Sequence, residues 1–136
     1  MGSRRRGREA ALQMLYQVDV SGVTPEQALA SYWTYLGANR EGEEFSTVLV
    51  KGWAEMRDRI DGIIREVSQH WRLERMARVD RNILRLATYE LIALDDVPRR
   101  VTLNEAVELA KRFGSEGSAG FVNGVLDRIA SDLGKK

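Results

Sequence analysis

The spacing of the apolar residues is the feature that most constrains this chain, because they recur every three or four positions over nearly its whole length. That period is typical of one face of an α-helix, and the strict alternation that marks strands is scarce. Ala11, Met14, Leu15 and Val18 illustrate the pattern near the start. We therefore predict an all-α fold, a compact bundle of about seven helices in two small helical subdomains.

Capping signals and chain breakers divide this pattern into helices. Thr24 and Gln27 form a capping box around Pro25, and Thr102 begins a second box. Ser118 is expected to cap the last helix. The predicted helical segments are about 8–20, 25–36 (before Gly37), 43–71 (broken near its middle), 73–77, 80–94, 102–113 and 118–134. We expect a single domain over 1–136, with a basic arm at 1–8 and subdomains at about 8–71 and 72–134.

Composition argues against an enzyme. The chain has no cysteine and one histidine, His70, which lacks a second histidine or a carboxylate cage around it. It also lacks a glycine-rich phosphate loop and a nucleophile elbow. We therefore expect no catalytic residue, no metal site and no cofactor. No stretch approaches the ~20 apolar residues of a membrane span, so we expect a cytoplasmic protein without membrane contact.

The charges are distributed unevenly. The 21 basic and 20 acidic residues give a net charge of +1, but Arg4, Arg5, Arg6 and Arg8 lie within five positions. Without these four charges, the rest of the chain carries −3. Arginine suits phosphate because its planar fork can bond two oxygens. The cluster therefore favours binding of single-stranded RNA, and the alternative is a solvated terminal tail.

The first helix extends this basic cluster with polar and aromatic side chains. Arg5, Glu9, Leu12 and Tyr16 are spaced to share one flank outside the apolar stripe, with Gln13 beside it. Rings can stack on bases and amides can read base edges, so this flank suits single-stranded RNA. For Tyr16, a half-buried core position with a wet hydroxyl is the alternative.

The last helix gives a similar indication at its start. Phe121 lies at the flank of the apolar stripe, where it is either an exposed ring for a base or a packing residue. Ser118 and Gly120 would leave backbone N–H groups free for a phosphate. Gly124 costs about 1 kcal/mol relative to alanine in a helix, which suggests close backbone packing or the approach of a partner.

Three segments resemble the NusB family of bacterial transcription antitermination factors. The first is 4–17 (RRRGREAALQMLYQ), and the second is 79–91 (VDRNILRLATYEL). The third combines 96–98 (DVP), 101–114 (VTLNEAVELAKRFG) and 121–127 (FVNGVLD). One position departs from the pattern, because Gly117 stands where family members often carry an acidic residue.

The resemblance implies two helical subdomains, no catalysis, and pairing with NusE, which doubles as a small-subunit ribosomal protein. The pair would bind boxA RNA of ribosomal RNA leaders and help RNA polymerase pass terminators within the elongation complex. The residues implied on the RNA surface are Arg4, Arg5, Arg6, Arg8, Gln13, Tyr16, Ser118 and Phe121. Those implied on the partner side are Glu74, Asp80, Glu105 and Lys111.

Three alternatives remain open from the sequence. The chain could be a protein-interaction adaptor without direct RNA contact, with a dispensable basic tail. It could be the NusB-like module of an RNA cytosine methyltransferase, although it ends without a nucleotide loop or a cysteine nucleophile. A homodimer could also cover the exposed aromatic flanks, which would make assembly a regulatory step.

Overall fold

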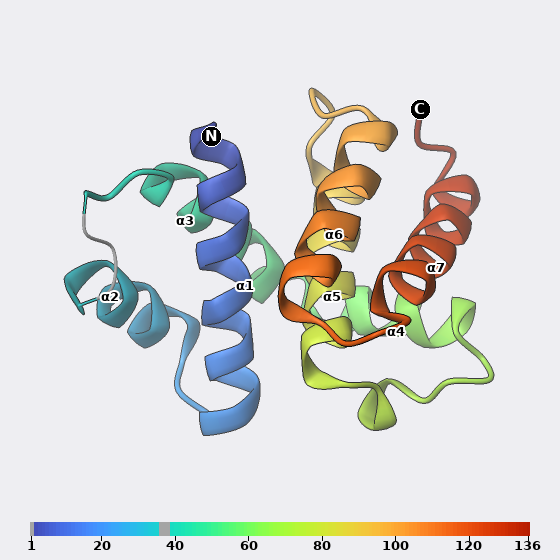
Figure 1. Cartoon of the computed structure of the whole chain (residues 1–136), viewed down its shortest axis with the longest axis horizontal. Helices are drawn as coiled ribbons and strands as arrows, with labels where there is room; N and C mark the ends of the chain where they lie inside the picture. The colour runs from blue at the N-terminus through green and yellow to red at the C-terminus, as the bar shows by residue number, and fades with distance from the viewer. Residues whose placement is uncertain (1, 36–38) are drawn as a thin grey trace. The chain divides into compact units, whose positions relative to one another are not determined.

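The computed structural model describes residues 2–35 and 39–136. Within these ranges the chain forms seven α-helices and one 3-10 helix and no strand, which confirms the all-α prediction (Figure 1). The elements are α1 (Ser3–Ser21), α2 (Pro25–Tyr35), α3 (Glu43–Glu55), α4 (Arg57–Val67), η1 (Leu73–Arg75), α5 (Arg78–Ala93), α6 (Arg99–Phe113) and α7 (Ser118–Leu133). No helix of the described part is long and apolar enough to cross a lipid bilayer.

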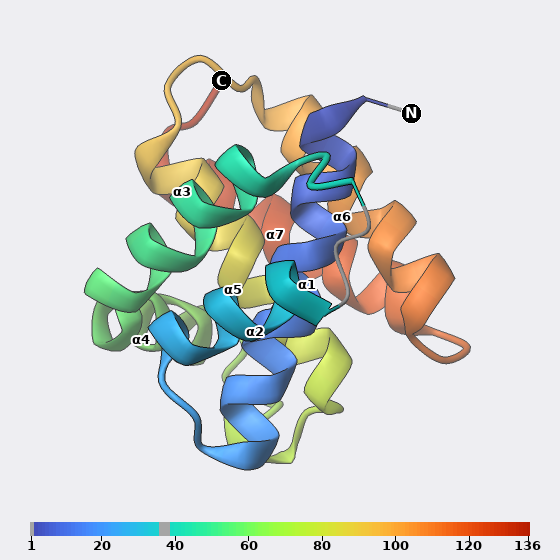
Figure 2. The ribbon, with the colours of Figure 1, turned by 90° about the vertical axis from the view of Figure 1, so that its left-hand side faces the viewer.

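Helices α1, α2 and α3 belong to the first of two compact units, Met1–Glu55. α1 packs against both of the others, and Figure 2 shows α2 lying across it. The apolar stripe predicted on the first helix is buried, as Met14 and Leu15 illustrate. Trp33 of α2 is buried too, and its indole N–H donates a hydrogen bond to Ser46 Oγ of α3 at 3.0 Å. The three helices therefore share one core.

The capping box predicted at the start of α2 is confirmed. The Gln27 N–H donates to Thr24 Oγ1 at 3.1 Å, and the Thr24 N–H donates to Gln27 Oε1 at 2.9 Å. Pro25 is the first helical residue, where its missing N–H leaves no hydrogen bond unmade. The predicted end of this helix, Leu36 followed by Gly37, lies outside the described residues.

Two glycines, one in α1 and one directly before α3, let the backbones of these two segments approach each other. A β-carbon at Gly42 would lie 2.5 Å from the Gly7 nitrogen and 2.8 Å from the Ser3 carbonyl oxygen. A β-carbon at Gly7 would lie 2.9 Å from Cβ of Phe45. Gly42 also has φ +84°, in the left-handed region that favours glycine. Side chains at these two positions would force α1 and α3 apart.

Helices α4 to α7 form the second unit, Met56–Lys136. The break predicted within residues 43–71 occurs at Met56, between α3 and α4. The subdomain division expected near residue 71 is wrong, because the units divide after Glu55 and α4 packs with α5 and α7. Ile60 and Ile64 of α4 are fully buried, so the apolar face of this helix contributes to the second core.

A polar network reinforces the packing of α4 against α5. Arg85 Nε and Nη2 donate to the two carboxylate oxygens of Asp61 at 2.9 and 3.2 Å. Arg85 Nη1 donates to Asn82 Oδ1 at 3.0 Å, and Asn82 Nδ2 donates to the Arg78 carbonyl at 2.8 Å. Asn82 is fully buried, and these bonds satisfy its amide group.

The second capping box, predicted at Thr102, is wrong. α6 already begins at Arg99, directly after Pro98, so Thr102 lies inside the helix. Its side chain is 1% exposed, and its hydroxyl lies 3.3 Å from Glu90 Oε1 of α5. Proline fixes its own φ at a value compatible with a helix, so the helix starts directly after Pro98 rather than at Thr102. α5 likewise begins at Arg78, two residues before the predicted start at Asp80.

We predict that Gly42→Ala destabilises the protein more than Gly22→Ala. Both glycines have positive φ, +84° and +71°, so each alanine pays a left-handed strain of about 1–2 kcal/mol. Only the alanine at position 42 also meets backbone atoms, because a β-carbon at Gly22 has nothing within 4 Å. Urea unfolding of the two variants measures the difference, and equal losses would contradict the tight α1–α3 approach.

Candidate nucleic-acid interface

The arginine cluster lies on a helix. α1 begins at Ser3, with Gly2 in an extended conformation before it, so the arginines occupy its first two turns. The prediction of a separate basic arm over residues 1–8 is therefore wrong. Cations at a helix N-terminus oppose the macrodipole, and we attribute the early start to the packing of α1 against α3. The guanidinium groups are consequently carried by an ordered turn.

The four arginines are not equally exposed. Arg4, Arg5 and Arg6 are exposed, whereas Arg8 is only 5% exposed. The guanidinium carbons of Arg4 and Arg8 lie 4.8 and 5.1 Å from the centre of the Phe45 ring. The expectation that Arg8 presents its charge to a ligand is not met, because α3 covers this side chain. We name the exposed set, Arg4, Arg5 and Arg6, the arginine turn.

The exposed face of α1 differs from the predicted flank. Glu9 and Leu12 are only 8% and 3% exposed, because α2 and α3 both pack on this helix. The residues that do face solvent continue at helical spacing toward the end of the helix: Gln13, Tyr16, Gln17 and Val20. Tyr16 is 41% exposed, so its ring is available at the surface. The sequence analysis did not predict Val20 as part of this exposed face, although Val20 continues the same helical spacing.

Tyr32 of α2 adds a hydroxyl near the arginine turn. Burial raises the pKa of Tyr32, the negative charge of Glu9 raises it further, and the positive charge of Arg6 opposes the shift. The phenol therefore keeps its proton at neutral pH and can donate a hydrogen bond. The sequence analysis did not select Tyr32, because its nearness to Arg6 depends on how α2 crosses α1.

Ser118 is the first residue of α7, so the prediction that it caps this helix is wrong; Gly117 holds the N-cap position, without a side-chain cap. The Ser118 side chain is 2% exposed, and its Oγ accepts a hydrogen bond from the Ser115 N–H at 3.0 Å. The Ser118 N–H in turn donates to the Ser115 carbonyl at 3.0 Å. The expected contact of Ser118 with RNA is therefore not supported by its surroundings. Gly117 has φ +90°, so the residue that departs from the family pattern supplies a left-handed turn here.

Phe121 forms one wall of a shallow groove in the second unit. Its ring packs edge-on against Trp71, with centroids 6.1 Å apart and planes at 75°. Trp71 is 64% exposed, whereas Phe121 is half-buried. Phe121 is therefore partly a packing residue and partly an exposed ring, so both alternatives from the sequence hold in part. The groove encloses about 360 Å³ and is lined by Val67, Ser68, Gln69, His70, Trp71, Gly120, Phe121, Gly124, Val125 and Arg128.

Glycines keep this groove open. A β-carbon at Gly120 or Gly124 would have nothing within 4 Å, so neither glycine serves close packing. The suggestion of close backbone packing at Gly124 is therefore wrong, and open space remains beside the helix. Sequence reasoning missed Trp71, whose only signal was a large aromatic residue in the polar segment before η1.

The residues predicted on the partner side lie on three elements of the second unit. Glu74 of η1 pairs with Arg65 at 2.7 Å, and Asp80 Oδ1 is buried without a hydrogen-bond partner among the described residues. Glu105 and Lys111 lie on α6, where six residues turn the helix by about 240°. Those two side chains therefore point to different sides of α6. Their role in partner binding stays a prediction.

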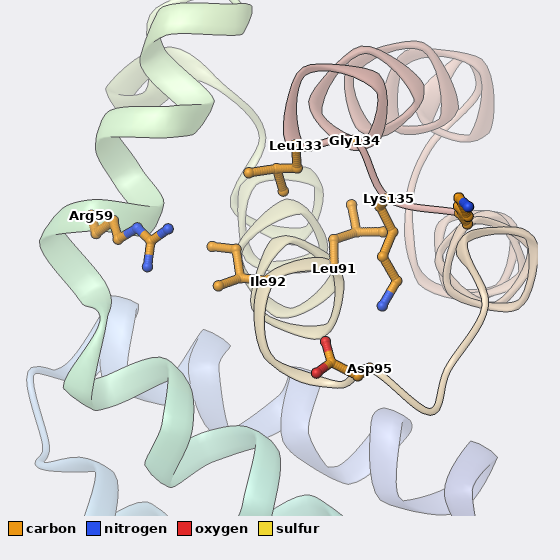
Figure 3. A pocket seen from close by; sticks show the side chains of 8 residues that line it. Arg59, Leu91, Ile92, Asp95, Leu133, Gly134 and Lys135 are labelled. Atoms are coloured by element: carbon orange, nitrogen blue, oxygen red, sulfur yellow. The ribbon is translucent and has the colours of Figure 1, made fainter.

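A second hollow of about 430 Å³ lies beside the end of α5 and is lined by Arg59, Leu91, Ile92, Asp95, Leu133, Gly134, Lys135 and Lys136. In Figure 3, Leu133 and Ile92 point toward one another and Lys135 extends toward Asp95. The Arg99 N–H donates to the Lys136 carbonyl at 2.8 Å, which holds the tail in place. The lining holds one acidic residue and no histidine or serine, so it does not assemble a catalytic set.

No group of three or more His, Asp or Glu side chains within residues 2–35 and 39–136 could hold a metal ion. His70 is exposed on the rim of the Trp71 groove. The fold and these surfaces define a class: a small all-helical protein with exposed arginines on the first turn of one helix and an aromatic groove in the second unit, suited to binding a ligand.

Known proteins identify the family within that class. The model of the NusB family matches residues 5–131, and the chain belongs to this family. The transcription antitermination protein NusB of Sorangium cellulosum (strain So ce56) is 53% identical over 135 residues, covering 99% of this chain and 96% of that protein.

Solved structures agree with this assignment. T. maritima NusB is 42% identical and has a TM-score of 0.86, covering 95% of this chain and 91% of that one. A crystal structure of antitermination factors NusB and NusE in complex with dsRNA matches with 30% identity and a TM-score of 0.86. That match covers 96% of this chain and 97% of the other.

We predict that Arg65→Gln raises the pKa of Glu74. The hydrogen bond from Arg65 holds the pKa of the Glu74 carboxyl below its ordinary value. A lowered folded-state pKa favours folding above the ordinary glutamate pKa, and this contribution disappears as the pH falls through the lowered value. NMR titration of the Glu74 carboxyl carbon measures the change, with Arg100→Gln as a control. An unchanged Glu74 titration would show that the ion pair does not persist in solution.

Proposed function

We propose that this protein is a non-enzymatic, RNA-binding transcription antitermination factor of the cytoplasm. It binds boxA RNA of ribosomal RNA leaders together with NusE and helps RNA polymerase read through terminators. Family membership and the solved NusB–NusE–dsRNA complex support this proposal. The observation that carries it is the arginine turn, in which three exposed cations are held on the first turn of a helix.

The arginine turn contacts the RNA backbone. Each guanidinium offers a planar fork of N–H donors that fits two phosphate oxygens. The arginine turn gathers three exposed cations at this end of α1, while the chain without the four clustered arginines carries a net charge of −3. Along the same helix, Gln13 and Tyr16 offer an amide and a ring to unpaired bases. This arrangement favours a small, directed contact over a broad electrostatic one.

The Trp71 groove takes an unpaired base. Its volume of about 360 Å³ lies in the range of small-ligand sites, and Trp71 and Phe121 present aromatic surface along it. Gln69 and His70 on its lining supply polar groups for base edges. Stacking on rings tolerates every base, so this groove contributes affinity more than sequence preference.

Four charged residues of η1, α5 and α6 contact NusE in this proposal. Glu74, Asp80, Glu105 and Lys111 are the residues assigned to that contact. This assignment follows the family resemblance, and Glu74 and Lys111 are exposed at the surface where a partner can reach them. The protein then joins the transcription elongation complex as one member of its pair with NusE.

We predict that Arg5→Ala combined with Arg6→Ala weakens boxA RNA binding without unfolding the chain. Both side chains are exposed, so removing them deletes phosphate-binding groups and little packing. The slope of log affinity against log salt should shrink by about 0.7 for each phosphate of a single strand that is no longer neutralised. Fluorescence anisotropy at several salt concentrations, with NusE present, measures both quantities.

The matched control removes the same charge elsewhere. Lys51→Ala combined with Arg100→Ala deletes two exposed cations outside the proposed surface. This variant should keep both the affinity and the salt slope of the wild-type protein. Equal effects of the two double variants would mean that net charge alone drives binding. Recovery of NusE in a pull-down without RNA binding by the pair would favour the adaptor alternative.

We predict that Phe121→Ala costs about 1–3 kcal/mol of RNA binding, because a stacked base loses its ring. Phe121 also packs against Trp71, so its effect on thermal unfolding must be measured beside RNA affinity. Trp71→Ala should weaken RNA binding with a smaller loss of stability, since Trp71 is largely exposed. Tyr35→Ala, which removes a ring that is 80% exposed, serves as the control. Equal losses of stability and RNA affinity at Phe121 would make it a packing residue only.

A further inference from the structure

The ring of Phe45 lies close to two arginines of α1. Arg4 and Arg8 are four residues apart, so they occupy adjacent turns on one side of the helix. Their guanidinium carbons lie 4.8 and 5.1 Å from the centre of the Phe45 ring, which comes from the start of α3. One ring therefore contacts both the exposed Arg4 and the buried Arg8.

We propose that Phe45 is a positioning residue for RNA binding, which fixes the arginine turn in one orientation before RNA arrives. This inference rests on the proposed function and adds a residue to it. A cation over an aromatic ring is attracted by the ring's negative face. A guanidinium that stacks on a ring uses its face, whereas its N–H donors lie in the guanidinium plane.

Ordering Arg4 before RNA binds lowers the conformational-entropy cost of binding. An arginine side chain that moves among many rotamers loses much of this freedom when it is held against a phosphate. Arg4 in contact with Phe45 has already given up part of that freedom in the unbound protein. The burial of Arg8 under α3 has a second effect, because it anchors the turn that carries Arg5 and Arg6.

The backbone around Phe45 is built for this contact. Gly7 lies between the two arginines in contact with the ring, and a β-carbon there would stand 2.9 Å from Phe45 Cβ and 3.0 Å from the Gly42 carbonyl. A β-carbon at Gly42 would in turn stand 2.5 Å from the Gly7 nitrogen. The two glycines thus bring the start of α3 near enough for its first aromatic side chain to reach both arginines.

The test compares Phe45→Leu with Phe45→Tyr. Leucine keeps apolar bulk but removes the ring, whereas tyrosine keeps the ring. We expect Phe45→Leu to weaken binding of a boxA RNA oligonucleotide, with NusE present, by about five-fold. Phe45→Tyr should bind as tightly as the wild-type protein. Urea unfolding reports the folded fraction of each variant, and Phe45→Met replaces the leucine variant if that one does not fold.

A double-mutant cycle with Arg4→Ala separates positioning from a general loss of stability. If Phe45 acts through Arg4, the effect of Arg4→Ala on RNA affinity should be smaller in the Phe45→Leu background. Additive losses, or unchanged affinity in Phe45→Leu, would overturn the inference while RNA binding itself stands. A wild-type chain that binds no boxA RNA, with or without NusE, would instead overturn the proposed function and this inference with it.

Discussion

The close approach of α1 to the start of α3 is the constraint on which the first unit and its candidate site depend. Gly7 and Gly42 bring two backbones into contact, which no pair of larger residues would permit. The contact places Phe45 against Arg4 and Arg8 and supports the early start of α1. Without it, the arginines would be a solvated tail. With it, three of them form an ordered cationic surface and the fourth becomes part of the packing.

Charge distribution follows from the same arrangement. A net charge of +1 conceals four arginines near one end and a net −3 over the rest of the chain. The net charge of −3 gives the rest of the chain no overall attraction to RNA, and salt screens the attraction of the arginine turn. Such a protein gains affinity from a few placed contacts, from stacking, and from a partner that contributes its own surface. This is consistent with a factor that works as one member of a pair.

Sequence reasoning succeeded where the determining interactions are local. The helical period located the apolar stripes, and the Thr24–Gln27 capping box was found because both of its hydrogen bonds join residues three positions apart. It failed where contacts between residues far apart in the sequence determine burial or the start of a helix. Arg8 and Arg5 look alike in the sequence, yet Arg8 is buried beside Phe45 of α3 and Arg5 is exposed. Thr102 carries a valid capping pattern, yet Pro98 starts the helix earlier. The Trp71 groove was missed because it joins a polar segment to a helix far along the chain.

The central claim is that a small, ordered arginine turn directs this protein to RNA together with NusE. Titration of boxA RNA with the wild-type protein, with and without NusE and at two salt concentrations, tests it most directly. The account predicts measurable binding that tightens when NusE is added and weakens at higher salt, with a slope that corresponds to a few phosphate contacts. Absence of RNA binding by both the protein and the pair would contradict it.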